Sequence, residues 1–126
     1  MSFHKAVSFF ESVKFAVNGI NKAFKTQRNF KIMCFIALVV IILSFVFKLE
    51  YVEWAVIFVC LFFTMFAEII NTSIESLIDN CYGETYSSHA ETVKDCTAGA
   101  VLLLAIGDIL IGFIIFLPKF ISMIGY

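Results

Sequence analysis

Three polar side chains stand at helical spacing within a stretch that is otherwise apolar enough to cross a membrane. Glu68, Asn71 and Glu75 are three and four residues apart inside residues 53–79. A carboxylate at the centre of a membrane helix costs about 2.5–3.5 kcal/mol even on the lenient insertion scale, so such residues usually have a function. They are the first candidates for a functional site.

The spacing places these side chains on one helix face at different depths in the membrane. A helix that starts at Trp54 on the outer side reaches Glu68 after about 14 residues, or about 21 Å. Glu75 lies two turns further along the same face, about 10 Å closer to the cytosol. A carboxylate at headgroup depth can take a proton from a lipid hydroxyl, and one nearer water can hold a divalent cation with nucleotide phosphates.

Lys94 and Asp95 stand at the start of another apolar stretch and add a cation for phosphate and a further anionic group. Together with the carboxylates, they are the groups that phosphoryl transfer to a lipid needs. The two residues could equally be a solvated helix start, and Glu68 and Glu75 could form interhelical polar pairs that only fix assembly. The residues by themselves leave these alternatives open.

The composition is that of a membrane protein without a sizeable soluble domain. The 126 residues are 61% hydrophobic and 15% charged, and the mean hydropathy is +0.96. A chain of this length can supply about three spans of ~20 residues, which predicts a single domain over residues 1–126. The net charge of −1 and the lack of a basic, aromatic-rich stripe argue against a nucleic-acid partner.

Hydrophobic periodicity predicts an all-α integral membrane protein with four helical elements. Residues 3–25 alternate apolar and basic positions every three or four residues, which is typical of an amphipathic helix lying in the membrane interface. Three membrane spans are predicted at about 30–47, 52–79 and 96–118, with Tyr51 and Trp54 as an interfacial aromatic belt. Residues 80–92 are predicted to be a loop or a short extramembrane helix end, and Pro118 with Lys119 to end the third span or let it protrude.

The distribution of basic residues predicts the orientation. The segments that would share the N-terminal side hold seven of them, and the opposite side holds only Lys48 and Lys119. The positive-inside rule therefore places the N-terminus and the 80–92 segment in the cytoplasm.

At this point two motifs carry a specific resemblance. The run EIINTSIESLID at 68–79, followed by VKDCTAGAV at 93–101, resembles the signature of the small bacterial diacylglycerol kinase and undecaprenol kinase family. The residues RNFK at 28–31, the 12–19 segment and IIFLPK at 114–119 are similar to the undecaprenol-type branch. The resemblance spans nearly the whole chain, and the family has neither a Gly-rich P-loop nor a soluble-kinase signature, as here.

The resemblance implies a homotrimer in the bacterial cytoplasmic membrane that phosphorylates a lipid alcohol with ATP and Mg²⁺, at sites shared between neighbouring chains. It implies undecaprenol rather than diacylglycerol as the acceptor. Glu68 would be the catalytic base, with Glu68 and Ala98 contacting the lipid. Glu75 and Gln27 would bind the metal ion. The implied ATP contacts are Phe15, Gln27, Asn71, Glu75, Tyr86, Lys94 and Asp95.

Three departures from the family pattern bear on activity. Gln27 stands where the family usually has a second metal-binding Glu, and an amide offers an oxygen but no charge. Ser8 replaces a common Arg, and Ser87 replaces the usual His, with His89 two residues away. These changes allow a slower kinase, a different lipid, or a protein that binds nucleotide or lipid without turnover.

Two further possibilities remain open from the sequence. A small channel or transporter subunit could use Glu68 and Glu75 to line an ion pathway. Asp108, after Gly107 near the middle of the third span, has no role in the family pattern. It could be protonated, paired across a trimer axis, or part of a lipid-specific pocket.

Overall fold

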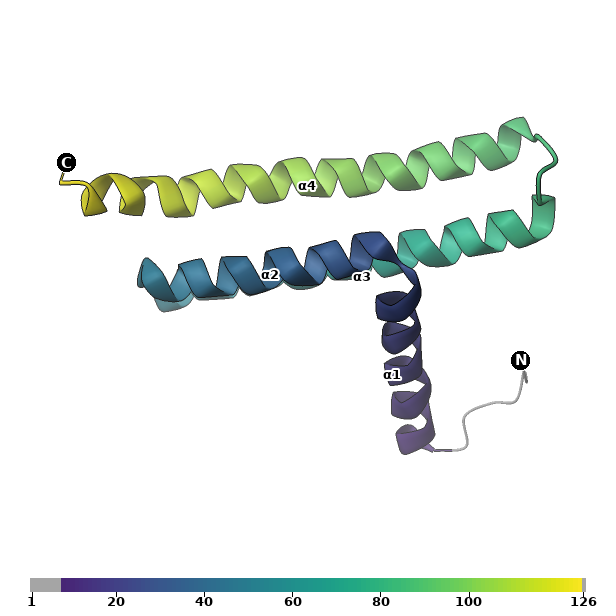
Figure 1. Ribbon diagram of the computed structural model, residues 1–126, viewed down its shortest axis with the longest axis horizontal. Helices are drawn as coiled ribbons and strands as arrows, with labels where there is room; N and C mark the ends of the chain where they lie inside the picture. Colours follow the sequence, from purple (N-terminus) through teal and green to yellow (C-terminus); the bar gives the residue numbers. More distant parts are fainter. Residues whose placement is uncertain (1–7, 126) are drawn as a thin grey trace.

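The computed structural model describes residues 8–125 and contains four helices and no strand in that part of the chain. They are α1 (Phe9–Thr26), α2 (Arg28–Val46), α3 (Tyr51–Tyr82) and α4 (Ser88–Met123). Figure 1 shows α2, α3 and α4 running alongside one another, while α1 crosses their direction at one side. The predicted interfacial helix at 3–25 corresponds to α1, and residues 3–7 of that prediction lie outside the described residues.

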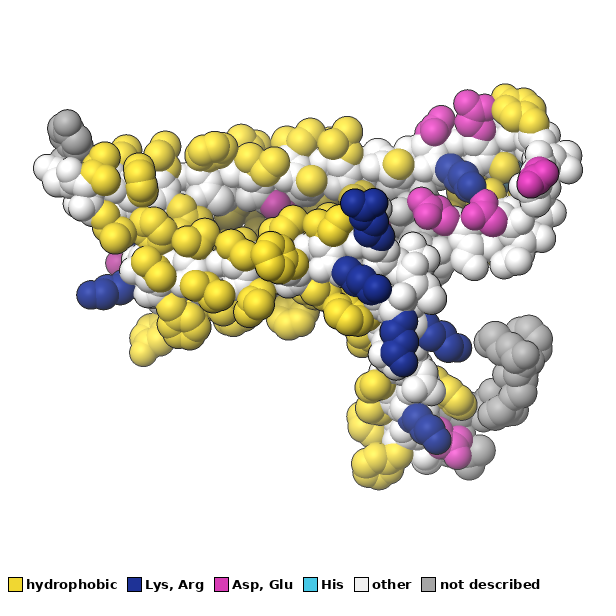
Figure 2. Space-filling view, in the orientation of Figure 1, with side chains coloured by type: hydrophobic (Ala, Val, Ile, Leu, Met, Phe, Trp, Pro, Cys, Tyr) yellow, Lys and Arg dark blue, Asp and Glu magenta, His cyan; other side chains and the backbone are white. Residues whose placement is uncertain are grey.

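Helix α1 is amphipathic and almost entirely exposed. Ser8 caps its first turn by accepting a hydrogen bond from the backbone N–H of Glu11 at 3.3 Å. Ala23 is its only buried residue. A single extended residue, Gln27, separates α1 from α2 and lets the chain change direction. Figure 2 shows Lys and Arg side chains over α1 and its junction with α2, beside apolar side chains.

The connections between the long helices are short. The α2–α3 turn spans residues 47–50, with Lys48 at a φ of 54°, and Glu50 and Glu53 form a reciprocal capping box at the start of α3. The α3–α4 connection spans only 83–87, where Gly83 takes a φ of 59° and Ser87 caps α4. The predicted 80–92 segment is therefore mostly helical, because helix ends that leave the membrane are polar and lose the apolar pattern.

Helices α3 and α4 are longer than the membrane is thick. The 32 residues of α3 span about 48 Å, against a hydrocarbon core of about 30 Å. Helix α4 has 36 residues and continues through Pro118 to Met123, so the proline does not end it. The polar ends of both helices meet near the α3–α4 turn, where Figure 2 shows a cluster of Asp and Glu side chains.

Polar contacts at three levels set the antiparallel register of α3 and α4. Asp79 pairs with Lys94 near the turn. Thr64, which lies 15 residues before Asp79 on α3, contacts Asp108, which lies 14 residues after Lys94 on α4. Eleven residues further on both helices, the Lys119 ammonium lies 2.9 Å from the Glu53 carboxylate. The nearly equal steps show that one register is kept along the whole pair.

The apolar core of the single chain is small. Leu49, Ile57 and Ile115 are buried together near the α2–α3 turn, and most other large apolar side chains of the three long helices are exposed. A protein surface this apolar suits a lipid environment rather than water. The three long helices are each long and apolar enough to cross a membrane, so the predicted all-α membrane fold is confirmed.

Replacement of Ile57, which is 4% exposed, should test this small core. We expect Ile57→Ala to destabilise the protein by about 2–3 kcal/mol, because it leaves a void between α3 and its neighbours. Thermal unfolding in detergent micelles measures the effect. Val59→Ala, on an exposed position of the same helix, is the matched control and should change the unfolding temperature much less. Equal effects of the two substitutions would contradict this description of the core.

Candidate active site

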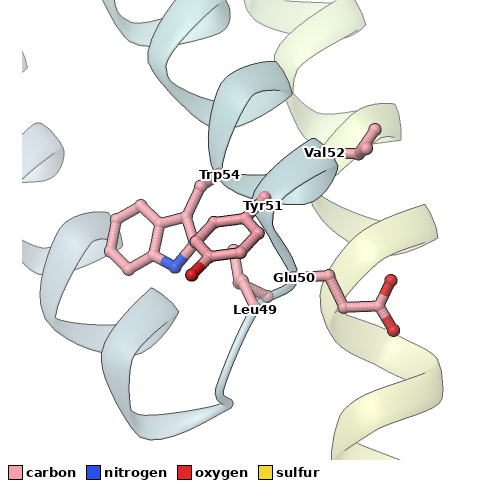
Figure 3. Close-up of a pocket in the computed structure, with 5 residues that line it drawn as sticks. All are labelled: Leu49, Glu50, Tyr51, Val52 and Trp54. Carbon is pink, nitrogen blue, oxygen red and sulfur yellow. The ribbon is translucent and has the colours of Figure 1, made fainter.

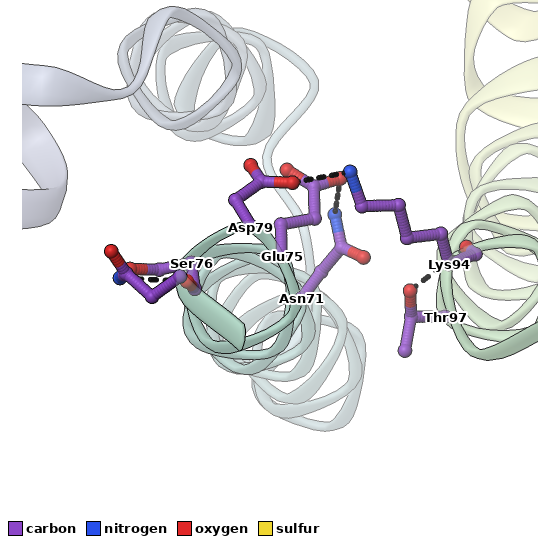
Figure 4. Close-up of polar contacts among 7 residues, drawn as sticks. Asn71, Glu75, Ser76, Asp79, Lys94 and Thr97 are labelled. Carbon is purple, nitrogen blue, oxygen red and sulfur yellow. Dashed lines mark hydrogen bonds and ion pairs between the residues drawn. The ribbon is translucent and has the colours of Figure 1, made fainter. Parts of the chain in front are cut away.

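One face of α3 brings the predicted polar residues together. Glu68 is 4% and Asn71 9% exposed, which makes them two of the few buried residues of the chain. The Asn71 side-chain amide donates a hydrogen bond to the Glu75 carboxylate at 3.2 Å. Figure 4 shows Asn71, Glu75 and Asp79 projecting from successive turns toward α4. The helical spacing of these residues in the sequence accounts for their common face.

The carbonyl oxygen of Asn71 marks a position suited to a ligand. This Oδ1 atom is buried and has no hydrogen-bond partner among the described residues. A buried polar atom without a partner is costly, so this oxygen fits a site completed by a bound group. The amide nitrogen of Asn71 faces Glu75, and the oxygen points away from that carboxylate (Figure 4). Mg²⁺ is commonly held by one or two carboxylates together with substrate phosphates and water. Asn71 and Glu75 therefore offer a suitable oxygen donor set.

No group of three His, Cys, Asp or Glu side chains in residues 8–125 is arranged to hold a metal ion by itself. The described residues of α3 therefore do not supply a complete set of metal ligands by themselves. A cation that shares its ligands with a nucleotide needs fewer protein oxygens, and the α3 face is consistent with that arrangement.

Lys94 brings a positive charge from α4 to this face. Its ammonium lies 2.5 Å from the Asp79 carboxylate, and both side chains are largely exposed. The charge of Glu75 also acts on Lys94. Figure 4 shows the Lys94 side chain reaching across from α4 toward Asp79 and Glu75. The pairing of Asp79 with Lys94 joins two separate helices, so the spacing of residues within either helix does not predict it.

The N-terminus of α2 reaches Glu68, which lies farthest from the α3–α4 turn among Glu68, Asn71, Glu75 and Asp79, the four residues of the acidic face of α3. The Asn29 side chain interacts with the Glu68 carboxylate, and the negative charge of Glu75 also acts on that group. Gln27, at the joint between α1 and α2, is two residues before Asn29. Asn29 belongs to the RNFK segment that carries part of the resemblance, but the sequence pattern alone indicates no role for it. A contact between two separate helices has no signal in the spacing of either one.

A polar hollow of about 340 Å³ lies at the α3–α4 turn, next to the acidic face. Tyr86, Lys94 and Asp95 are among its lining residues. Tyr86 is 77% exposed, and its hydroxyl donates a hydrogen bond to the Glu91 carboxylate at 2.8 Å. Three predicted nucleotide contacts therefore share one hollow.

The remaining predicted site residues lie outside α3. Phe15 lies on α1 and is 48% exposed, Gln27 is half-buried at the helix joint, and Ala98 is exposed on α4. In the α3–α4 register, Ala98 lies at about the level of Glu75. The roles of these three residues stay predictions.

A larger hollow, about 560 Å³, lies at the opposite end of the molecule. Leu49, Glu50, Tyr51, Val52 and Trp54 line it, and Figure 3 shows the Glu50 carboxylate pointing away from the two aromatic rings. Its lining residues include no Lys or Arg and no carboxylate other than that of Glu50. Its aromatic residues are those predicted to lie in the outer interface, so the acidic face of α3 is the better candidate for a functional site.

The Tyr86 hydroxyl allows a direct test of the hollow at the turn. Its hydrogen bond to Glu91 raises the pKa of Tyr86, because ionisation would lose this bond and bring two negative charges together. We expect Glu91→Gln to lower the pKa of Tyr86, measured by ultraviolet titration, with Tyr86→Phe identifying its contribution to the curve. A titration curve that Glu91→Gln leaves unchanged would contradict this contact.

Comparison with known proteins relates the chain to membrane lipid kinases. The family model described as prokaryotic diacylglycerol kinase matches residues 14–116. The chain is 38% identical over 112 residues to a diacylglycerol kinase of Synechocystis sp., covering 89% of this chain and 64% of the relative. It is 36% identical over 111 residues to the undecaprenol kinase of Bacillus subtilis, covering 88% and 89%. A diacylglycerol kinase of Haemophilus influenzae is 26% identical over 105 residues, covering 83% and 89%.

The chain thus spans just under two thirds of the Synechocystis relative but most of the other two. The family match includes α2, all of α3 and most of α4, and therefore the whole acidic face. The resemblance seen in the sequence is confirmed. The chain belongs to the prokaryotic diacylglycerol kinase family, a family of lipid kinases.

Proposed function

We propose that this protein transfers the γ-phosphoryl group of ATP, with Mg²⁺, to the hydroxyl of a membrane lipid at the cytoplasmic interface. The observation that carries the proposal is the α3 face on which Glu68, Asn71 and Glu75 stand at successive depths. Such a face brings a base at lipid-headgroup depth close to oxygen ligands for a metal–nucleotide complex. Family membership supplies the reaction class.

Glu68 is the proposed general base. Its carboxylate takes the proton of the lipid hydroxyl as the hydroxyl oxygen bonds to the γ-phosphorus, while the bond from that phosphorus to the bridging oxygen breaks and ADP leaves. The Asn29 side chain, which interacts with Glu68, would orient its carboxylate. Its burial keeps water, a competing acceptor, away from the transferred group.

The nucleotide groups would be held one and two turns nearer the cytosol. Glu75, Asn71 and Gln27 would hold Mg²⁺, which neutralises charge on the phosphates when bound. The Lys94 ammonium, which pairs with Asp79 in this structure, would instead contact the phosphates and offset part of their negative charge. Asp95, Tyr86 and Phe15 would contact ATP, and Ala98 the lipid.

The orientation and assembly follow the same proposal. Positive-inside asymmetry places the N-terminus and the α3–α4 turn in the cytoplasm of a bacterial cell, where ATP is found. A homotrimer would cover part of the exposed apolar surface of the three long helices. It would also allow residues far apart in one chain, such as Phe15, to join a site on a neighbouring subunit.

Phosphate transfer from labelled ATP tests the proposal directly. In mixed micelles with Mg²⁺ and either undecaprenol or diacylglycerol, we expect a phosphorylated lipid from the wild-type protein. Glu68→Ala should lower the rate by at least about a hundredfold, as loss of a general base does. Glu50→Gln, at the far end of α3, is the matched control and should leave the rate nearly unchanged. Without product from either lipid, despite folded protein, the kinase proposal fails.

Gln27 favours examining a second function, that of a nucleotide- or lipid-binding protein with little turnover. An amide in place of a carboxylate should weaken metal binding. We expect Gln27→Glu to lower the Mg²⁺ concentration needed for half-maximal activity, measured by titrating Mg²⁺ at fixed ATP. A rise from no activity to ready turnover would identify the natural protein as an impaired enzyme.

A channel or transporter subunit is the remaining function to distinguish. It predicts ion flux through vesicles containing the protein, independent of ATP. The same preparation used for the kinase assay can be examined for this flux, and Glu68→Ala should abolish it if that carboxylate lines a pathway.

A further inference from the structure

Lys94 supplies the positive charge at an otherwise acidic end of the α3–α4 pair. Helix α3 carries no Lys or Arg, and Lys94 is the only one among the described residues that line the hollow at the α3–α4 turn. The same lining includes the carboxylates of Asp79, Glu91 and Asp95, and Glu75 lies one helical turn before Asp79 on α3. This end of the molecule therefore carries more negative than positive charge, which favours the binding of a further cation.

The Lys94 ammonium is the counter-ion of two carboxylates. It lies 2.5 Å from the Asp79 carboxylate, and the negative charge of Glu75 also acts on it. Figure 4 shows Lys94 reaching from α4 toward both side chains. Because residues four apart on a helix are neighbours, a single cation can contact Glu75 and Asp79 together. A divalent metal ion that prefers carboxylate oxygens is suited to the same position.

The contact between Asp79 and Lys94 can open at little cost. The side chain of Asp79 is 62% and that of Lys94 43% exposed, and exposed ion pairs contribute little to stability. The two other polar contacts between α3 and α4 lie in the middle and at the opposite end of the helix pair. Lys94 can therefore turn toward another partner while α3 and α4 stay in register.

A nucleotide with its metal ion would favour both halves of such an exchange. In the proposed function the phosphates draw Lys94 away, which leaves the carboxylates of Asp79 and Glu75 beside each other without a cation. Like charges four residues apart on a helix repel, and a metal ion between them removes this repulsion. Asn71 and Gln27, the other side chains proposed for the metal ion, bring oxygens but no charge. Asp79 would therefore supply the second negative charge.

We propose that Asp79 is a further metal ligand, which exchanges Lys94 for the divalent cation of the nucleotide complex and binds it together with Glu75. This inference rests on the proposed function and adds a residue to the ligands given there. The exchange couples the two parts of the metal–nucleotide complex, because Lys94 becomes available to the phosphates when the cation takes its place at Asp79. The competing explanation is that Asp79 and Lys94 only join α3 to α4 near the turn.

Binding of Mn²⁺ tests the exchange without nucleotide or lipid acceptor. Mn²⁺ accepts the same oxygen ligands as Mg²⁺, and its free ion can be counted by electron paramagnetic resonance. In a neutral detergent we expect Lys94→Gln to strengthen Mn²⁺ binding by up to about fivefold, because an exposed ion pair no longer competes for the carboxylates. In that variant, Asp79→Asn should weaken Mn²⁺ binding about tenfold or more, the usual effect of losing a metal ligand or its support.

Glu91→Gln is the matched control, because Glu91 lines the same hollow and its replacement removes the same charge. In the Lys94→Gln protein it should weaken Mn²⁺ binding much less than Asp79→Asn, since an exposed charge that does not touch the cation is screened. Circular dichroism checks that each variant keeps its helices. Equal weakening by Asp79→Asn and Glu91→Gln would show an effect of net charge alone and overturn the proposal. A Lys94→Gln protein that binds no Mn²⁺ would overturn it as well.

The nuclear magnetic resonance signal of Lys94 tests the other half of the exchange. In protein with ¹³C-labelled lysine, Lys94→Gln identifies the resonance of this side chain. At a Mg²⁺ concentration that displaces bound Mn²⁺, we expect the wild-type resonance to move toward its position in Asp79→Asn, because both changes break the contact with Asp79. A resonance that stays in place under these conditions would contradict the exchange.

These measurements also separate this inference from the kinase proposal. They involve neither ATP nor a lipid acceptor, so Mn²⁺ binding that depends on Asp79 supports the exchange even if no phosphorylated lipid is formed. Conversely, a protein that phosphorylates lipid but binds Mn²⁺ equally well with and without the Asp79 carboxylate leaves the kinase proposal in place and rejects Asp79 as a ligand.

Discussion

The antiparallel pairing of α3 and α4 is the constraint on which the rest of the structure depends. Polar groups in a membrane protein need partners, and here they find them across this pair near both ends and in the middle. A shift of one residue would move every pair by about 1.5 Å and turn it by about 100° around the helix. Because all three pairs would be lost together, they support one another in specifying the register.

That register determines what lies beside the acidic face of α3. It carries Lys94 over Asp79 and Glu75, and it places Asp108 one turn on the membrane side of Glu68. Helix α2 adds Asn29 from the opposite side, because the joint at Gln27 starts α2 at the same level as the acidic face. Asn29 of α2 and Lys94 of α4 thus lie beside the acidic face that α3 contributes.

The sequence predicted the elements better than the contacts between them. Apolar runs and the spacing of Glu68, Asn71 and Glu75 are local properties, and the structure shows the corresponding helices and common face. The polar helix ends near residues 80–92 were harder to predict because they lie outside the apolar pattern. The contact of Asn29 with Glu68 depends on how α2 approaches α3, which no periodicity within either helix specifies.

Glu68 of α3 and Asp108 of α4 lie about one helical turn apart along the helix pair, and their carboxyl groups have different surroundings. Glu68 has Asn29 beside it and the polar side chains of Asn71 and Glu75 between it and the α3–α4 turn. If Glu68 is the proposed base, these groups give the proton that it takes a polar path out of the membrane. Asp108 has a hydroxyl, a thiol and an apolar cavity around it, and no such route. Under the proposed function Glu68 is therefore the carboxyl group placed to exchange a proton, whereas the contact of Asp108 with Thr64 joins α4 to α3.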